Sequence, residues 1–166
     1  MPVHHHTIIE YANSLGVTLP LQETFWELGD LTALRQASDG RFYRSNYERG
    51  MLLYALVAHH RPAHVLEFGT GRGYGSLCMA WAMHDHDING QIYSVDVLTA
   101  DTPIEWAIDR HDGAGPVLRT LTWNEVWEQA APPQWRGHLV LLNGDSSTVM
   151  QRETLPPMNL VFIDGG

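Results

Sequence analysis

An apolar run followed directly by alternating glycines constrains this chain more than any other stretch. Residues 64–68 (HVLEF) have the short apolar character of a buried strand, and residues 69–73 carry glycine at every second position. Glycines let the backbone turn sharply and admit a ligand closer than a Cβ atom would allow. Residues from Tyr74 onward predict a helix whose first amides would face that ligand. The stretch therefore predicts a strand, a glycine loop and a helix.

The spacing of these glycines argues against a dinucleotide site. The fingerprint G-x-G-x-x-G requires glycine at its sixth position, which is Tyr74 counted from Gly69 and Ser76 counted from Gly71. Residues 67–73 instead follow the pattern E-x-G-x-G-x-G. A carboxylate at the strand end would repel a pyrophosphate but suits a ligand with a cationic amino or sulfonium group. An ordinary glycine-rich turn of an α/β protein is the alternative interpretation.

Composition narrows the class of protein. With 166 residues, 44% of them hydrophobic, the chain predicts one domain with a real core. We expect no membrane association, because no apolar stretch is long enough to span a bilayer, and the single Cys78 indicates a reducing cytoplasm. The formal net charge of -9 argues against nucleic acid as a partner. We expect a small or neutral substrate.

Later apolar runs predict three more strands. They cover residues 91–96, 138–142 and 159–163. The first of these runs ends in Asp96. In a parallel nucleotide-binding fold, an acid at the end of the second strand is placed to bind both ribose hydroxyls. Asp96 thus favours a ligand that contains a nucleoside.

Helical patterns separate these strands. Ser45 with Glu48, and Thr102 with Glu105 after Pro103, have the spacing of capping boxes and predict helices to about His60 and His111. The other predicted helices cover residues 7–15, 21–37, 74–84, 122–131 and 146–152. We expect the helix from Ser45 to pack under the sheet.

Other features carry alternatives. The segment between the second and third strands contains Trp123, Trp127 and Trp135, which line a substrate pocket, form an interface, or pack on the domain's own surface. His4–His6 and residues 85–90 contain clustered histidines and aspartates. Because consecutive side chains diverge, we expect a flexible terminus and a solvated turn rather than metal sites.

Four motifs together resemble the class I S-adenosylmethionine-dependent methyltransferases. They are the acid and glycine loop from Glu67, the acid Asp96, the pair Asp145-Ser146, and the segment Ile163-Asp164-Gly165-Gly166. The amino-acid sequence of these motifs is most similar to the small-molecule O-methyltransferase and cephalosporin-hydroxylase-like branch. The resemblance covers residues 45–166 and implies a donor site whose residues are Glu67, Gly69, Thr70, Gly71, Gly73, Asp96, Asp145 and Ser146.

The resemblance also implies the architecture. It is an α/β, Rossmann-like fold with a parallel sheet in the order 3-2-1-4, helices on both faces, and a helical extension over residues 1–44. Residues 45–166 would form the S-adenosylmethionine-binding domain. Family members have seven strands, so the fourth strand would leave an apolar edge at residues 160–163. We expect a fragment of a longer chain, or a homo-oligomer in which another subunit completes the sheet.

Function follows from the resemblance in the same way. It implies methylation of a small molecule, most simply at oxygen, with Asp164 as the base or as a ligand of Mg²⁺. The alternatives are a turn role for Asp164 and a capping role for Asp145 and Ser146. At the level of the whole chain, the alternative is a non-catalytic S-adenosylmethionine-binding or assembly module. A nicotinamide-dependent oxidoreductase is disfavoured by the glycine spacing and by Glu67.

Overall fold

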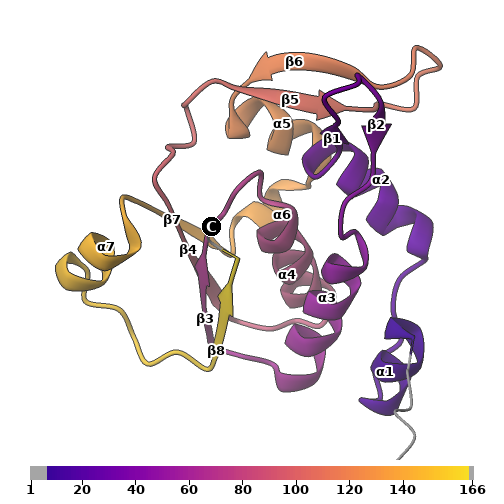
Figure 1. Ribbon diagram of the computed structural model, residues 1–166. Helices are drawn as coiled ribbons and strands as arrows, with labels where there is room; N and C mark the ends of the chain where they lie inside the picture. Colours follow the sequence, from indigo (N-terminus) through magenta and orange to yellow (C-terminus); the bar gives the residue numbers. More distant parts are fainter. Residues whose placement is uncertain (1–6, 165–166) are drawn as a thin grey trace, which may run out of the picture.

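The computed structural model describes residues 7–164, and its centre is a four-stranded parallel sheet (Figure 1). The strands lie in the order β7 (Leu139–Asn143), β4 (Gln91–Asp96), β3 (His64–Phe68) and β8 (Leu160–Ile163). In chain order this is 3-2-1-4, so the predicted sheet is confirmed. The histidines at 4–6 and the glycines at 165–166 lie outside the described residues.

Alternate side chains of the strands point to the two faces of the sheet. Val65 and Ile92 belong to the large core cluster, on the side of α3 (Glu48–His60), α4 (Tyr74–Asp85) and α6 (Pro133–Arg136). Leu66 and Val95 pack instead with Val149 of α7 (Ser146–Arg152), which lies on the other side. Helices therefore cover both faces, as predicted.

The helix α3 packs mainly on α4 rather than directly under the sheet, as Figure 1 also shows. It begins at Glu48, and its N-cap residue Tyr47 makes no side-chain capping bond. The predicted capping box at Ser45 is therefore wrong. Asn46 has a left-handed backbone with φ of 54°, and the hydroxyl of Tyr47 donates to buried Asp30 at 2.8 Å, so tertiary contacts shift the helix start.

The N-terminal section packs on the same helical layer. It contains α1 (Ile8–Ser14), α2 (Gln22–Thr32) and a short antiparallel pair, β1 (Arg35–Gln36) with β2 (Phe42–Tyr43). The helix predicted for residues 21–37 thus ends at Thr32. Pairing of β1 with β2 draws the last predicted residues into an extended conformation.

An antiparallel hairpin and a helix lie between β4 and β7. The strands β5 (Ile104–Ile108) and β6 (Val117–Leu121) form the hairpin, and α5 (Trp123–Ala130) follows (Figure 1). The helix predicted from Thr102 is therefore wrong. The Thr102 hydroxyl oxygen accepts from the Thr99 amide at 3.1 Å, and Trp106 is fully buried within the strand. Within residues 7–164, no helix is long and apolar enough to cross a bilayer.

Candidate functional site

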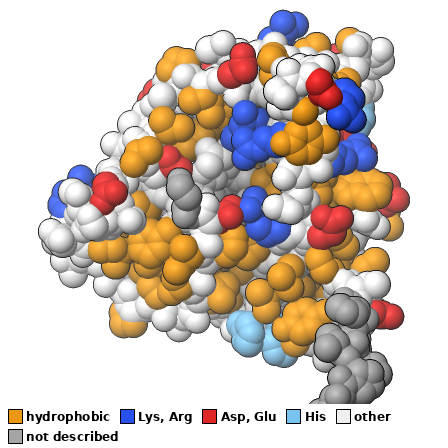
Figure 2. Space-filling view, in the orientation of Figure 1, with side chains coloured by type: hydrophobic (Ala, Val, Ile, Leu, Met, Phe, Trp, Pro, Cys, Tyr) orange, Lys and Arg blue, Asp and Glu red, His pale blue; other side chains and the backbone are white. Residues whose placement is uncertain are grey.

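A cavity of about 560 Å³ opens at the carboxyl ends of β3, β4 and β8. This is the side of a parallel sheet on which α/β proteins bind ligands, at the point where strand order reverses. Figure 2 shows the surface hollowed there, with arginine and carboxylate side chains at its margin. Its wall includes Glu67, Gly69, Thr70, Gly71, Asp96, Asp145, Ser146 and Asp164. All predicted site residues except Gly73 therefore line one cavity.

The glycine loop has the backbone conformation that requires glycine. Gly69, Gly71 and Gly73 have φ of 88°, 59° and 88°, in the left-handed region that other residues rarely adopt. A Cβ atom built on Gly71 would meet no heavy atom within 4 Å, so this position opens on the cavity. A Cβ on Gly73 would lie 2.1 Å from Cζ2 of Trp127. Gly73 therefore serves close packing behind the loop and not the cavity wall.

Glu67 is a buried carboxyl group at the floor of the cavity. It is 1% exposed, and its Oε2 atom accepts hydrogen bonds from the hydroxyls of Ser76 on α4 and Ser94 on β4. The hydroxyl oxygens of Thr70 and Ser94 are 2.6 Å apart. Because Ser94 donates to Glu67, Thr70 donates to Ser94. Burial raises the pKa of Glu67 to about 7, although the two serine hydroxyls act in the opposite direction.

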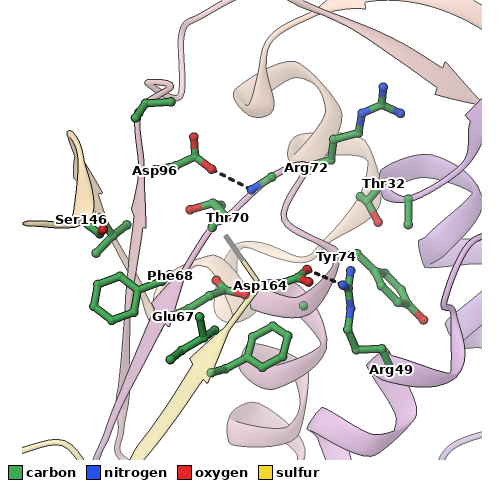
Figure 3. A pocket seen from close by; sticks show the side chains of 18 of the residues that line it. Thr32, Arg49, Glu67, Phe68, Thr70, Arg72, Tyr74, Asp96, Ser146 and Asp164 are labelled. Atoms are coloured by element: carbon green, nitrogen blue, oxygen red, sulfur yellow. Dashed lines mark hydrogen bonds and ion pairs between the residues drawn. The ribbon is translucent and has the colours of Figure 1, made fainter. Parts of the chain in front are cut away.

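Asp96 lies at the end of β4, as predicted, and it holds two backbone segments. Its Oδ2 atom accepts from the amide of Gly71 at 2.9 Å, and its Oδ1 atom accepts from the amide of Leu98 at 3.0 Å. Each carboxylate oxygen has a further lone pair. The same group can therefore fix the loop and accept hydrogen bonds from a ligand in the cavity (Figure 3).

Asp145 and Ser146 form the wall beyond Asp96. Asp145 caps α7, since its Oδ1 atom accepts from the hydroxyl and the amide of Ser147, the latter at 2.9 Å. These bonds, the hydroxyl's first, lower the pKa of the Asp145 carboxyl group. The capping role expected as the alternative is present for Asp145, and both residues also line the cavity.

Asp164 forms an ion pair with Arg49 of α3, and Figure 3 shows the two side chains facing one another. The Nε atom of Arg49 is buried and has no hydrogen-bond partner among residues 7–164. The guanidinium carbon lies 6.0 Å from the ring centre of Phe162. Arg49 was not predicted as a site residue, because a lone arginine in the first turns of a helix carries no signal of a functional role. Ser76 and Ser94 were not predicted either, because a single serine within a helix or a strand carries no signal of its partner.

The described residues offer little to a metal ion. Among residues 7–164 there is no group of three His, Cys, Asp or Glu side chains arranged to hold one. The turn after α4 is tied to α3 instead, because Tyr54 donates to Asp85 at 2.9 Å and lies 3.3 Å from Nε2 of His86.

The fold is similar to that of solved methyltransferases. The chain is similar to the S-adenosylhomocysteine-bound methyltransferase PaMTH1 of Podospora anserina, with 14% identity, a TM-score of 0.56, and coverage of 99% of this chain and 60% of that one. It is similar to the O-methyltransferase TomG of Streptomyces achromogenes, involved in tomaymycin synthesis and solved with S-adenosylmethionine. There the identity is 15%, the TM-score 0.53, and the coverage 92% of this chain and 58% of that one.

At these identities the likeness shows the fold, and the chain spans about three fifths of the length of these structures. A search of curated proteins found no match. The family comparison is more specific, because residues 66–166 match the family described as "Methyltransferase domain". That match begins in β3, includes the glycine loop, Asp96 and Asp145, and extends through Asp164. The chain belongs to this methyltransferase family.

Proposed function

We propose that the chain binds S-adenosylmethionine and takes part in methylating a small molecule, at an oxygen atom. The observation that carries the proposal is the convergence of three separate motifs on one cavity. These are the acid and glycine loop after β3, Asp96 after β4, and Asp164 after β8. Family membership supports the same reading.

The cavity suits a nucleoside that carries an amino-acid chain. Its volume of about 560 Å³ lies within the range of small-molecule sites, roughly 300–1,000 Å³. We assign Asp96 to the ribose hydroxyls, and Asp145 with Ser146 to the adenine ring. Gly71 leaves room for close approach of the ligand to the backbone. In this arrangement the amino group of the donor lies toward Glu67.

The protonation of Glu67 fits a cationic ligand. With its pKa near 7, the carboxyl group exists in both forms at neutral pH. A bound ammonium or sulfonium group stabilises the ionised form, because opposite charges at short range attract strongly in a buried site. Binding of such a ligand would therefore displace a proton from Glu67.

Asp164 is the proposed proton acceptor. The donor supplies a methyl group already activated on a sulfonium ion. An acceptor hydroxyl transfers its proton to Asp164, its oxygen forms the new bond to the methyl carbon, and the carbon–sulfur bond breaks with its electrons on sulfur. Arg49 pairs with the Asp164 carboxylate and fixes its direction. The cavity wall aligns the two reactants.

The site fits a divalent cation poorly. Mg²⁺ requires several oxygen ligands, whereas the Asp164 carboxylate pairs with a guanidinium group and the described residues contain no metal-binding cluster. The proposal therefore contains no metal step.

We further infer a homo-oligomer that works in a reducing cytoplasm. Val161 and Ile163 on β8 are 50% and 70% exposed, which supports a partner that covers this strand. Cys78 is buried and unpaired, as is usual for thiols in a reducing compartment. Size-exclusion chromatography with light scattering tests the oligomer, and a Val161→Asp variant should shift it toward monomer.

Calorimetric titration with S-adenosylmethionine, S-adenosylhomocysteine and NAD tests the donor assignment. We expect the two adenosyl compounds to bind and NAD not to bind. Binding of NAD alone would overturn the proposal. Mass spectrometry of a panel of hydroxylated small molecules incubated with the donor then separates catalysis from the alternative, a binding or assembly module, which predicts binding without methyl transfer to any acceptor.

A further inference from the structure

Two tryptophans of α5 bind the back of the glycine loop. The indole Nε1 of Trp123 donates to the carbonyl oxygen of Gly71 at 3.0 Å, and that of Trp127 donates to the carbonyl oxygen of Arg72, also at 3.0 Å. The two rings are stacked, with centroids 5.7 Å apart and an angle of 5° between their planes. Both side chains are buried. The carbonyl groups of two consecutive loop residues therefore each accept a hydrogen bond from a different indole N–H group.

Other hydrogen bonds connect the glycine loop to the surrounding elements. Asp96 accepts from the amide of Gly71, and the guanidinium of Arg72 donates to the carbonyl oxygens of Leu34 and Glu105, each at 2.8 Å. The Trp127 ring also fills the space behind Gly73, where no Cβ atom would fit. Both backbone polar groups of Gly71 are therefore satisfied by side chains outside the loop. One of these partners, Trp123, belongs to the inserted segment of residues 97–138.

We propose that Trp123 and Trp127 are positioning residues that hold the glycine loop in its ligand-binding conformation. Through them, residues 97–138 set the affinity of the cavity for its donor. The donor part of this inference rests on the proposed function. Its physical basis is that glycines lose more conformational freedom on ordering than other residues, so a loop that is already ordered binds more tightly.

The competing explanation is that the two tryptophans only fill the core, since both belong to the large buried cluster. The two explanations differ in what the indole N–H group does. Replacing tryptophan with phenylalanine keeps an aromatic ring but removes the donor, leaving the loop carbonyl without its partner. A core-filling role predicts a general loss of stability. A positioning role predicts a change confined to the loop.

Hydrogen exchange of the ligand-free protein tests the loop directly. The amides of Gly71 and Gly73 are protected by bonds to Asp96 and to the carbonyl of Thr70, the latter at 2.8 Å. In Trp123→Phe and Trp127→Phe we expect these two amides to exchange about tenfold faster, a change of about 1.4 kcal/mol in local opening. Amides of β4 should keep their rates.

Trp135→Phe is the control for loss of ring volume. Trp135 lies on α6 and stacks on Trp81, with ring centroids 5.0 Å apart. It should leave the exchange of the loop amides unchanged. Unchanged loop exchange in both α5 variants, or an equal increase in the loop and in β4, would overturn the inference. If one variant does not fold, the other gives the same test.

Binding of S-adenosylhomocysteine supplies the second readout. We expect each α5 variant to bind it about five- to tenfold more weakly, and Trp135→Phe to bind like the parent chain. Equal affinity of the parent chain and all variants for S-adenosylhomocysteine would overturn the inference that the two tryptophans set donor affinity. If the parent chain itself fails to bind, the proposed function fails, while the exchange experiment still decides whether the tryptophans position the loop.

Discussion

The backbone amide of Gly71 donates a 2.9 Å hydrogen bond to Oδ2 of Asp96. The glycine loop after β3 and the end of β4 are thereby joined through one carboxylate, which also accepts from the amide of Leu98. Because this group faces the cavity, its role in shaping the loop and its role in binding a ligand are coupled.

Replacing Asp96 with alanine should abolish measurable binding of S-adenosylhomocysteine. The change removes the ribose acceptor and leaves two amides without partners, which lowers the free energy of unfolding by about 1–3 kcal/mol. Calorimetry and urea unfolding measure the two effects. Asp101→Ala is the matched control. The exposed Asp101 carboxylate accepts from the side-chain amide of Asn124 at 2.7 Å, and Asp101 does not line the cavity. Undiminished binding by folded Asp96→Ala would refute the ribose assignment.

The buried carboxyl of Glu67 should make stability depend on pH. Its pKa of about 7 lies above the ordinary glutamate value of 4.5, so the folded state holds a proton that the unfolded state releases. Its contribution is therefore fully present below about pH 4.5 and is lost as pH rises through 7. We expect the free energy of unfolding to fall by about 1–3 kcal/mol between pH 5 and 8, and less in Glu67→Gln.

The comparison with Glu67→Gln isolates the contribution of this carboxyl group, because the two proteins share every other ionisable group. Urea unfolding at pH 5, 6, 7 and 8 gives both profiles. Parallel profiles for the two proteins would show that Glu67 is ionised throughout.

The Arg49–Asp164 pair should control the methyl-transfer rate more than donor affinity. For Asp164→Asn we expect a rate lower by about 10²–10⁴-fold, the usual contribution of a general base, and a dissociation constant for S-adenosylhomocysteine within about threefold of the parent value. Arg49→Gln should lower the rate less. In the double variant the effects should not add, because the two groups act as a unit.

Product formation followed by mass spectrometry measures these rates. Arg41→Gln is a suitable control, since Arg41 pairs with Asp39 on the surface and both side chains are mostly exposed. A folded Asp164→Asn variant with the parent rate would exclude Asp164 as the base.

Gly73→Ala should destabilise the fold strongly. The new methyl group would lie 2.1 Å from Trp127 in a backbone conformation with φ of 88°, and we expect a loss of about 2–4 kcal/mol in the free energy of unfolding. Gly113→Ala separates the steric contact from the backbone conformation, because Gly113 has φ of 89° but open space around it. Its loss should be about 1 kcal/mol. Equal losses in urea unfolding would show that the contact with Trp127 is unimportant.

Local patterns predicted the elements whose determinants lie within a few residues. The strand at 64–68 and the glycine loop follow from the local sequence pattern alone. The helix predicted for residues 122–131 also forms, and Thr122 caps it by accepting from the amide of Glu125 at 3.2 Å. The strand order required the family resemblance, since no local pattern sets which strands are neighbours.

Elements that depend on distant partners were not predictable in this way. Residues 104–108 form a strand because they pair with residues 117–121, and this pairing overrides the helix signal of Thr102. The partner of Asp164 is Arg49, 115 residues earlier in the chain. Ser76 and Ser94 meet Glu67 only once α4 and β4 have packed on β3. The glycine loop and the acidic site residues could therefore be predicted from the sequence. The side chains that hydrogen-bond to those acidic residues could not.

The strand β3 has one neighbour close in the chain and one far away. Its pairing with β4 joins Val65 to Ile92, whereas its pairing with β8 joins Val65 to Leu160. During synthesis on the ribosome, β3 and β4 can associate early, but the other edge of β3 has no partner until β8 emerges. Such long-range pairing is slow, and until it forms the unpaired edge of β3 and its apolar side chains are accessible to chaperones. The nascent protein therefore gains its cavity late, when Asp164 reaches Arg49.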